Sequence, residues 1–267
     1  MRGGGFNWRR MPELGALMAL FLVFLYAPLV ILIIYAFNGS DLALVWGGFS
    51  MRWFAKALAN EDLRRAAYNS LVIGVSATII STAFAVPAAL AFERGRRFWG
   101  RAAGDGLIAL PLVEPEVVTA VTTLAFFSGI NLQLGLGNLI IAHAVFCIPF
   151  AVLPIRARLR EMPSDIEDAA RDLYGNDWQV FRLVTLPLLM PAIVSGAMLA
   201  FVVSLDDFLI SMMVAQAGST TLPVYLYGML RLGVTPEANA AATLLLAVSV
   251  AAVSLSYLFT SRRRKAY

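Results

Sequence analysis

Two pairs of carboxylates interrupt stretches of the sequence that are otherwise strongly apolar. They lie within residues 106–127 and 187–214, and they are Glu114, Glu116, Asp206 and Asp207. If these stretches cross a membrane, an unpaired charge in them costs on the order of 3 kcal/mol. Each acid is therefore expected to face a water-filled cavity, a partner or another polar group.

Ser204, Asp207 and Ser211 have the spacing i, i+3 and i+7, so on a continuous helix they form one polar stripe. Asp206 points about 100° away from Asp207 on the same helix. Glu116 falls near the middle of its stretch. A carboxylate can replace part of the hydration that a cation loses on leaving water, so acids at two depths suit a cationic solute. We predict that Glu116, Ser204, Asp207 and Ser211 line a substrate pathway.

The same carboxylates allow two other interpretations. An intramembrane aspartyl protease would use Asp206 and Asp207, but that chemistry needs two carboxyls that meet across a site, and neighbours on one helix diverge. The sequence also lacks a Gly-x-Gly-Asp motif. An ion-coupled secondary transporter is the other alternative, and it is disfavoured because we detect no inverted repeat.

The longest polar interval of the C-terminal half predicts a short amphipathic helix. Ser164 and Glu167 have the spacing of a capping box, and three acids crowd the first turn, where the helix dipole favours negative charge. Apolar residues then recur at helical spacing, at Ile166, Ala169, Ala170 and Leu173. Such a helix between two spans suits docking to a soluble partner, although an ordinary surface helix-turn-helix gives the same pattern.

A turn and a second helix are expected to follow. Gly175 can end the first helix, and either Asn176 or Asp177 can cap the second. Pro187 and Pro191 then lead into the next apolar stretch.

This polar interval resembles the EAA loop of ABC importer permeases. The resemblance rests on Asp168, Ala169, Ala170, Gly175, Leu186 and Pro187. Two positions depart from the consensus of that family, which has Glu-Ala-Ala followed by a glycine. Asp168 replaces the glutamate, with Glu167 beside it, and Tyr174 occupies the glycine position, with Gly175 one residue later. We therefore expect the turn to be kept but reshaped.

The segments around Glu116 and Asp207 resemble the second permease subunit of spermidine/putrescine importers, and the resemblance covers nearly the whole chain. It implies a type I ABC importer permease fold, all α-helical, with six transmembrane helices and a cytoplasmic coupling helix. It implies that the coupling helix docks on an ATPase subunit through Glu167, Asp168, Ala169, Ala170, Leu173, Tyr174 and Gly175. The implied partners are a second permease subunit, two ATPase subunits and a periplasmic solute-binding protein. The implied cargo is a small cationic solute such as putrescine or spermidine.

Composition requires a membrane location, because 60% of the residues are hydrophobic and only 14% are charged. A soluble domain has about a quarter of its residues charged. Apolar stretches long enough to span a bilayer predict six helices, at residues 14–37, 69–92, 106–127, 139–155, 187–214 and 238–260. We expect an N-terminal part (1–68), a permease core (69–260) that contains the coupling loop (161–187), and a basic tail (261–267).

The distribution of basic residues predicts the orientation. With both termini in the cytoplasm of a bacterial inner membrane, 16 of the 21 Lys and Arg residues fall on the cytoplasmic side. This orientation also places the coupling loop in the cytoplasm. The chain has no GxxxxGK[ST] sequence, so we expect no bound cofactor, with ATP and Mg²⁺ held by the partner ATPase. The single His143 and the single Cys147 are interpreted as packing residues, with no metal site.

Overall fold

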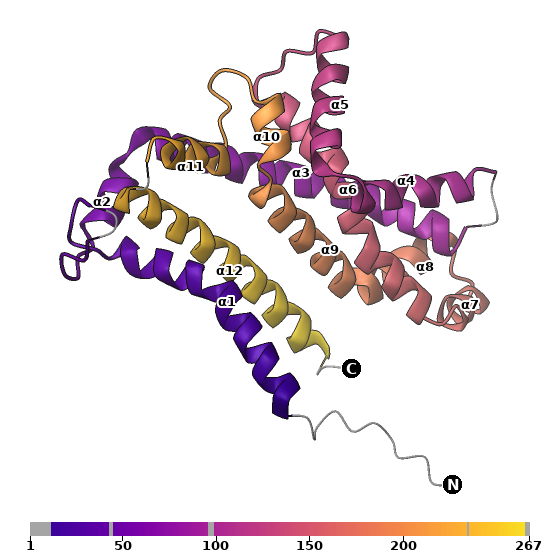
Figure 1. The fold of residues 1–267 in the computed structure, drawn as a ribbon. Helices are drawn as coiled ribbons and strands as arrows, with labels where there is room; N and C mark the ends of the chain where they lie inside the picture. The colour runs from indigo at the N-terminus through magenta and orange to yellow at the C-terminus, as the bar shows by residue number, and fades with distance from the viewer. Residues whose placement is uncertain (1–11, 43–44, 96–98, 234, 265–267) are drawn as a thin grey trace. The chain divides into compact units, whose positions relative to one another are not determined.

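The computed structural model describes residues 12–42, 45–95, 99–233 and 235–264, which are helical apart from turns and one isolated β-bridge between Asn38 and Phe49 (Figure 1). The helices are α1 (Pro12–Ala36), α2 (Arg52–Ala59), α3 (Glu61–Glu93), α4 (Arg101–Val113), α5 (Glu116–Gly129), α6 (Leu136–Glu161), α7 (Asp165–Asp172), α8 (Asp177–Val180), a π-turn η2 (Phe181–Thr185), α9 (Leu186–Asp206), α10 (Leu209–Val214), α11 (Leu222–Arg231) and α12 (Pro236–Arg264). The N-terminal residues 1–11 and the end of the expected basic tail, residues 265–267, lie outside the described residues.

Four helical segments of the described chain are long and apolar enough to cross a membrane. They are Leu14–Ala36, Glu61–Glu93, Leu136–Glu161 and Asp177–Asp206. The α4–α5 pair makes a fifth if it is one broken span, and α12 carries a shorter apolar stretch, Pro236–Ala251. The prediction of a helical protein with several spans is therefore confirmed, and the count of six stays a prediction.

The expected third span is two helices rather than one. α4 and α5 are bent by 112° at a break formed by Glu114 and Pro115, both in extended conformation. Proline disfavours helical geometry in the residue before it and has no N–H to continue the ladder. The stretch 106–127 is therefore not one continuous helix, and Glu116 lies in the first turn of α5 rather than in mid-helix.

The expected fifth span is also interrupted. α9 ends at Asp206, Asp207 is extended (φ −61°, ψ 127°), and the short α10 begins at Leu209. No proline lies at this break. The prediction of one helix over residues 187–214 is therefore wrong.

The chain divides into two compact units, and the larger comprises residues 61–228 with 245–267. Within it α3, α6 and α9 pack against one another, and α5 packs against α10. Small side chains such as Ala85, Ala151 and Ala200 fill the interface. A Cβ at Gly196 would lie 2.5 Å from the Ala151 carbonyl oxygen, so α9 crosses α6 at backbone contact.

The smaller unit comprises residues 1–60 with 229–244. Its helices meet where Ala36, Trp53 and Ala240 are buried together. At its polar side Lys56 Nζ lies 3.0 Å from the carboxylate of Glu237. These contacts join the end of α1, α2 and the start of α12.

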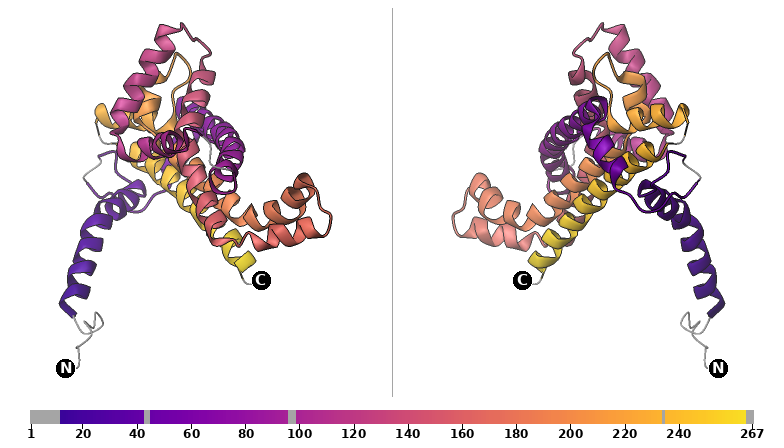
Figure 2. Two further views of the ribbon diagram at one scale, coloured as in Figure 1. Left: turned by 90° about the vertical axis from the view of Figure 1, so that its right-hand side faces the viewer. Right: turned by 90° about the vertical axis from the view of Figure 1, so that its left-hand side faces the viewer.

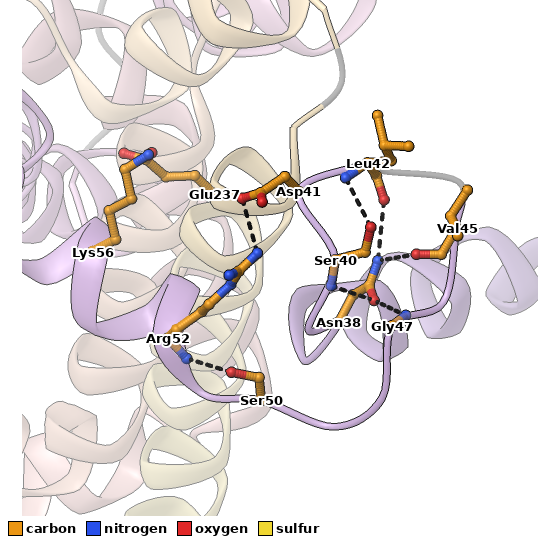
Figure 3. Close-up of polar contacts among 10 residues, drawn as sticks. All are labelled: Asn38, Ser40, Asp41, Leu42, Val45, Gly47, Ser50, Arg52, Lys56 and Glu237. Atoms are coloured by element: carbon orange, nitrogen blue, oxygen red, sulfur yellow. Dashed lines mark hydrogen bonds and ion pairs between the residues drawn. The ribbon is translucent and has the colours of Figure 1, made fainter.

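The loop after α1 is ordered by one buried amide (Figure 3). The Asn38 side chain donates to the carbonyl oxygens of Leu42 and Val45, at 3.2 and 2.8 Å, and accepts from the N–H groups of Ser40 and Gly47. The NH2 group thus donates both of its hydrogens and the amide oxygen accepts two hydrogen bonds, so all the polar atoms of this buried side chain have partners. Arg52 pairs with Asp41 beside it, at 2.9 Å.

Candidate functional site

A buried polar cluster lies where α9 gives way to α10, with His143 of α6 at its centre. The ring Nδ1 is 2.8 Å from Ser204 Oγ, and Nε2 is 3.1 Å from Ser211 Oγ. The same Nε2 is 3.3 Å from Asp207 Oδ2. All four side chains are buried. His143 is buried, as expected of a packing residue, and it is hydrogen-bonded as well, while Cys147 one turn along α6 lies in the apolar core as expected.

The break in the fifth span gathers this cluster. The Asp207 carboxylate accepts hydrogen bonds from the backbone N–H groups of Ile210 (3.3 Å) and Ser211 (2.8 Å), so it caps α10. Ser204, Asp207 and Ser211 do converge, as predicted, but around a helix break and not along one helical stripe. Asp206 is exposed while Asp207 is buried, which confirms that the two neighbours diverge.

Glu116 connects the cluster with the surface of the chain. Its carboxyl lies next to the Asp207 carboxyl and the backbone of Leu209, while the residue itself is exposed. Glu114, in the break between α4 and α5, instead accepts a hydrogen bond from the Thr119 hydroxyl of α5. The two broken spans therefore place their interrupted ends together, with acids at both. Irregular backbone at membrane depth is tolerated only where it is buried in protein or lines a cavity, and broken helices mark many transport sites.

The 161–187 loop forms the second candidate site, at the end of α6 and α9 that lies away from α5 and α10 (Figure 2). The predicted short helix is α7, but its predicted capping box is wrong. The Ser164 side chain makes no capping bond, and Glu167 is buried and turned inward. Glu167 Oε2 accepts from Arg94 Nε at 3.1 Å, and Oε1 accepts from the Thr185 hydroxyl at 3.0 Å. Arg94 and Thr185 were not predicted as site residues.

The turn after α7 has a left-handed residue where the EAA consensus has glycine. Tyr174 adopts φ 61°. Its N–H donates to the Arg171 carbonyl at 2.9 Å, and the Gly175 N–H donates to the Ala170 carbonyl at 3.2 Å, the two bonds of a Schellman motif. A Cβ at Gly175 would lie 2.8 Å from that Ala170 oxygen. Tyr174 thus adopts the left-handed conformation, and Gly175 allows the close approach to the Ala170 carbonyl. In the consensus turn a single glycine stands at the first of these positions, so the turn is kept but reshaped.

The second helix of the loop begins with a capping box. The Asn176 side chain accepts from the Gln179 N–H, and the Gln179 side chain accepts from the Asn176 N–H, both at 2.9 Å. The predicted cap is therefore confirmed, at Asn176. Asp177 hydrogen-bonds the Arg171 guanidinium and, with Asp168, raises the pKa of Arg171 above its ordinary value. This charge is fixed at any physiological pH.

The loop leaves large apolar side chains uncovered. Leu173 is 83% exposed and Tyr174 is 98% exposed, and Ile166 and Trp178 are also exposed. Ala169 is exposed and Ala170 is half-buried. Contiguous exposed apolar residues mark interaction surfaces. Within the described residues no group of three His, Cys, Asp or Glu side chains could hold a metal ion.

Comparison with known proteins identifies relatives of the whole chain. Residues 81–265 match the family described as binding-protein-dependent transport system inner membrane component. The chain is 39% identical to the putrescine transport system permease protein PotI of Escherichia coli K12, over 89% of this chain and 86% of that protein. It is 36% identical to the spermidine/putrescine transport system permease protein PotC of Haemophilus influenzae, over 92% and 96% of the two chains.

Solved structures share the fold at low sequence identity. A chain of a bacterial alginate ABC transporter in complex with an alginate-bound periplasmic protein superposes with a TM-score of 0.72 at 18% identity, covering 96% of this chain and 94% of that one. A chain of the MetNI methionine ABC transporter gives a TM-score of 0.63 over 75% and 95% of the two chains. These likenesses confirm the expected importer permease fold.

Proposed function

This chain belongs to the family of binding-protein-dependent transport system inner membrane components, and we propose that it forms half of a pathway for a polyamine. It is a transporter subunit of the inner membrane and not an intramembrane protease. The observation that carries the cargo proposal is its identity of 34 to 39% with permeases named for putrescine and spermidine, over most of both chains.

The acids at the two broken spans support a cationic cargo. A polyamine carries several ammonium groups, each of which loses hydration on entering the membrane. Glu116 is exposed and lies next to the buried Asp207, so it offers an acidic side chain at the entrance of the polar cluster. A carboxylate in a partly dry passage replaces some of the lost hydration, while one acid at each depth binds weakly enough to release the solute. Glu116, Ser204, Asp207 and Ser211 are the proposed route.

The uncovered face of the 161–187 loop supports docking to an ATPase. On this proposal the loop and both termini are cytoplasmic, and α7 is the coupling helix. The complex contains a second permease subunit, two ATPase subunits that bind ATP and Mg²⁺, and a periplasmic solute-binding protein. The proposed docking residues on this chain are Asp168, Ala169, Ala170, Leu173, Tyr174 and Gly175. Glu167, which the resemblance also implied, is buried against Arg94 and Thr185 and does not belong to this surface. Leu173 offers the largest exposed apolar side chain of α7 and its cap.

Glu116→Gln tests the cargo route, because it keeps the size of the side chain and removes its charge. Uptake of radiolabelled putrescine by the assembled complex should fall roughly tenfold or more, as expected for the loss of a charged hydrogen-bonding partner. Asp207→Asn should also lower uptake, but it weakens the cap of α10 as well. Glu114→Gln is the matched control, because Glu114 lies two residues away and its carboxylate accepts from the Thr119 hydroxyl of α5. Equal uptake in the Glu116 and Glu114 variants would assign Glu116 to helix packing.

Leu173→Asp tests the docking surface. A charge in an apolar contact should uncouple ATP hydrolysis from uptake while the chain stays in the membrane. Leu232→Asp is the matched control, since Leu232 is equally exposed but lies outside the loop. Normal substrate-stimulated ATP hydrolysis and normal uptake in Leu173→Asp would exclude this surface as the docking site.

A further inference from the structure

Arg94 lies just after the last residue of α3, and its guanidinium reaches two other segments. Nε donates to Glu167 Oε2 at 3.1 Å, and Nη2 donates to the Met162 carbonyl at 2.8 Å. Met162 ends α6, and Glu167 is in the first turn of α7. One side chain therefore holds the corner between α6 and α7 against the end of α3.

The other oxygen of Glu167 extends the contact to α9. Thr185 Oγ donates to Glu167 Oε1 at 3.0 Å, and Thr185 is the last residue of the π-turn that leads into α9. The carboxylate is almost fully buried, and Arg94 is partly buried. A buried carboxylate with both oxygens bonded holds its neighbours in one geometry.

The other ion pairs near this end of the bundle do not join the loop to a transmembrane helix. Glu93 pairs with Arg156 and Arg160, which joins α3 to α6. Arg171 pairs with acids of the loop itself. Among the ion pairs of the described residues, Arg94–Glu167 is the one that ties α7 to a transmembrane helix.

Stability alone is a weak explanation for this arrangement. A buried ion pair generally adds little net stability compared with apolar residues of the same volume, although losing one partner is costly. The π-turn at 181–185 widens the backbone at the point where the loop joins α9, and single π-turns are frequent at functional joints. A hydrogen-bonded ion pair between these segments fixes their relative orientation, because its bonds are directional and apolar contacts are not.

We propose that Arg94, Glu167 and Thr185 form a brace that transmits displacement of α7 to α3 and α9. The three are positioning residues, and the inference rests on the proposed function, in which an ATPase displaces α7. Without the brace α7 can tilt on its own backbone connections while its exposed apolar face stays docked. Coupling between distant sites needs such contiguous networks with discrete arrangements.

Glu167→Gln and Thr185→Val test the brace in the assembled complex, with Arg160→Gln as the matched control. Arg160 is an exposed arginine at the end of α6, and its partner Glu93 keeps Arg156 when it is replaced. The amount of putrescine taken up per ATP hydrolysed should fall by about threefold to thirtyfold in the two brace variants. ATP hydrolysis itself should persist, and the control should match the wild type.

A second measurement needs no transported solute. Hydrogen exchange of the α7 amides in the detergent-solubilised complex should be faster in both brace variants than in Arg160→Gln. Arg94→Lys keeps the charge but cannot donate along both directions of the guanidinium fork, so it should be intermediate. If the wild-type complex takes up no putrescine, the cargo proposal fails, and the exchange measurement still decides on the brace.

Two results would overturn the brace. The first is an unchanged uptake-to-hydrolysis ratio together with unchanged α7 exchange in Glu167→Gln. If Glu167→Gln fails to assemble, Thr185→Val decides instead, because it removes a single hydrogen bond and keeps the side-chain size. Wild-type values in Thr185→Val would then show that the contact only supports folding.

Discussion

His143 is the only histidine of the chain, and it bonds three oxygens that belong to the two halves of a broken span. Ser204 belongs to α9, Ser211 belongs to α10, and Asp207 lies between them. A buried polar group without a partner is costly, so the imidazole and the three oxygens stabilise one another as a set. His143 therefore fixes how α10 leaves α9.

We predict that His143→Ala destabilises the folded chain by about 1–3 kcal/mol, because it leaves buried oxygens without their partner. The apparent melting temperature of the protein in detergent measures the loss. Cys147→Ala is the control, because Cys147 lies one turn further along α6, is equally buried, and has only a weak contact, 3.4 Å from the Ala200 carbonyl oxygen. Equal losses from the two substitutions would mean that His143 acts through its volume alone.

Some residue roles were within reach of the sequence and others were not. The turn at residues 174 and 175 follows from the EAA spacing, and a cap at Asn176 or Asp177 follows from the residue types. The hydrogen-bond partners of His143 were not predicted, because a lone histidine in an apolar stretch gives no spacing pattern. The available signal was the free-energy cost of a polar side chain at membrane depth, which implies that His143 has hydrogen-bond partners there. Glu167 was assigned to a cap because its spacing from Ser164 fits one, although burial and Arg94 draw it inward.

The crossing of α6 and α9 depends on the absence of a side chain at Gly196. Gly196→Ala would place a Cβ against the Ala151 backbone, which cannot move without shifting α6. We expect a loss of about 1–3 kcal/mol of stability from this overpacking. The loss is measured as a decrease in the apparent melting temperature of the protein in detergent, relative to that of a control variant.

Gly106→Ala is the control for this crossing. Gly106 is also helical, in α4, but nothing lies within 4 Å of a Cβ built there. The substitution should be neutral or stabilising by about 0.5–1 kcal/mol, because alanine is the better helix former. The explanation by backbone contact fails if both alanine substitutions change stability alike.

The two helix breaks differ in how well they could be predicted. Pro115 is an explicit signal that residue 114 leaves the helical region. The break after Asp206 has no proline, and uniform apolar sequence on both sides hides the end of one helix and the start of the next. Aspartate is a favoured N-cap, so Asp207 carried a weak signal for a new helix, and it was outweighed by the length of the apolar run.

At the scale of the whole molecule, the charge distribution predicts that the loop after α1 and the C-terminal end face opposite sides of the membrane. Val45→Cys and Arg263→Cys, each in a Cys147→Ser background, test this. A membrane-impermeant maleimide should label the first in intact cells and the second only after permeabilisation. Val45 is exposed, and its Asn38 contact is through the backbone, so the substitution spares the loop. The side chain of Arg263 lies outside the described residues.

Labelling of both variants in intact cells would contradict the orientation. The native Cys147 is buried, so replacing it serves only to remove background. The helical class and the membrane location could be predicted from composition, and the fold from the resemblance. The packing of α3, α6 and α9 could not be predicted. It depends on small side chains that let the helices approach closely, and a pattern of polar and apolar residues does not distinguish one apolar stretch from another.

The uncovered side chains of the 161–187 loop also affect the abundance of this protein in a cell. If the loop docks an ATPase as proposed, any copy that has not met it leaves four apolar side chains exposed: Ile166, Leu173, Tyr174 and Trp178. Proteases and chaperones recognise exposed apolar side chains, so they compete with the ATPase for this surface. On the proposed function, we therefore expect copies made in excess of the ATPase to be degraded, so that the steady-state amount of the subunit follows the supply of its partner.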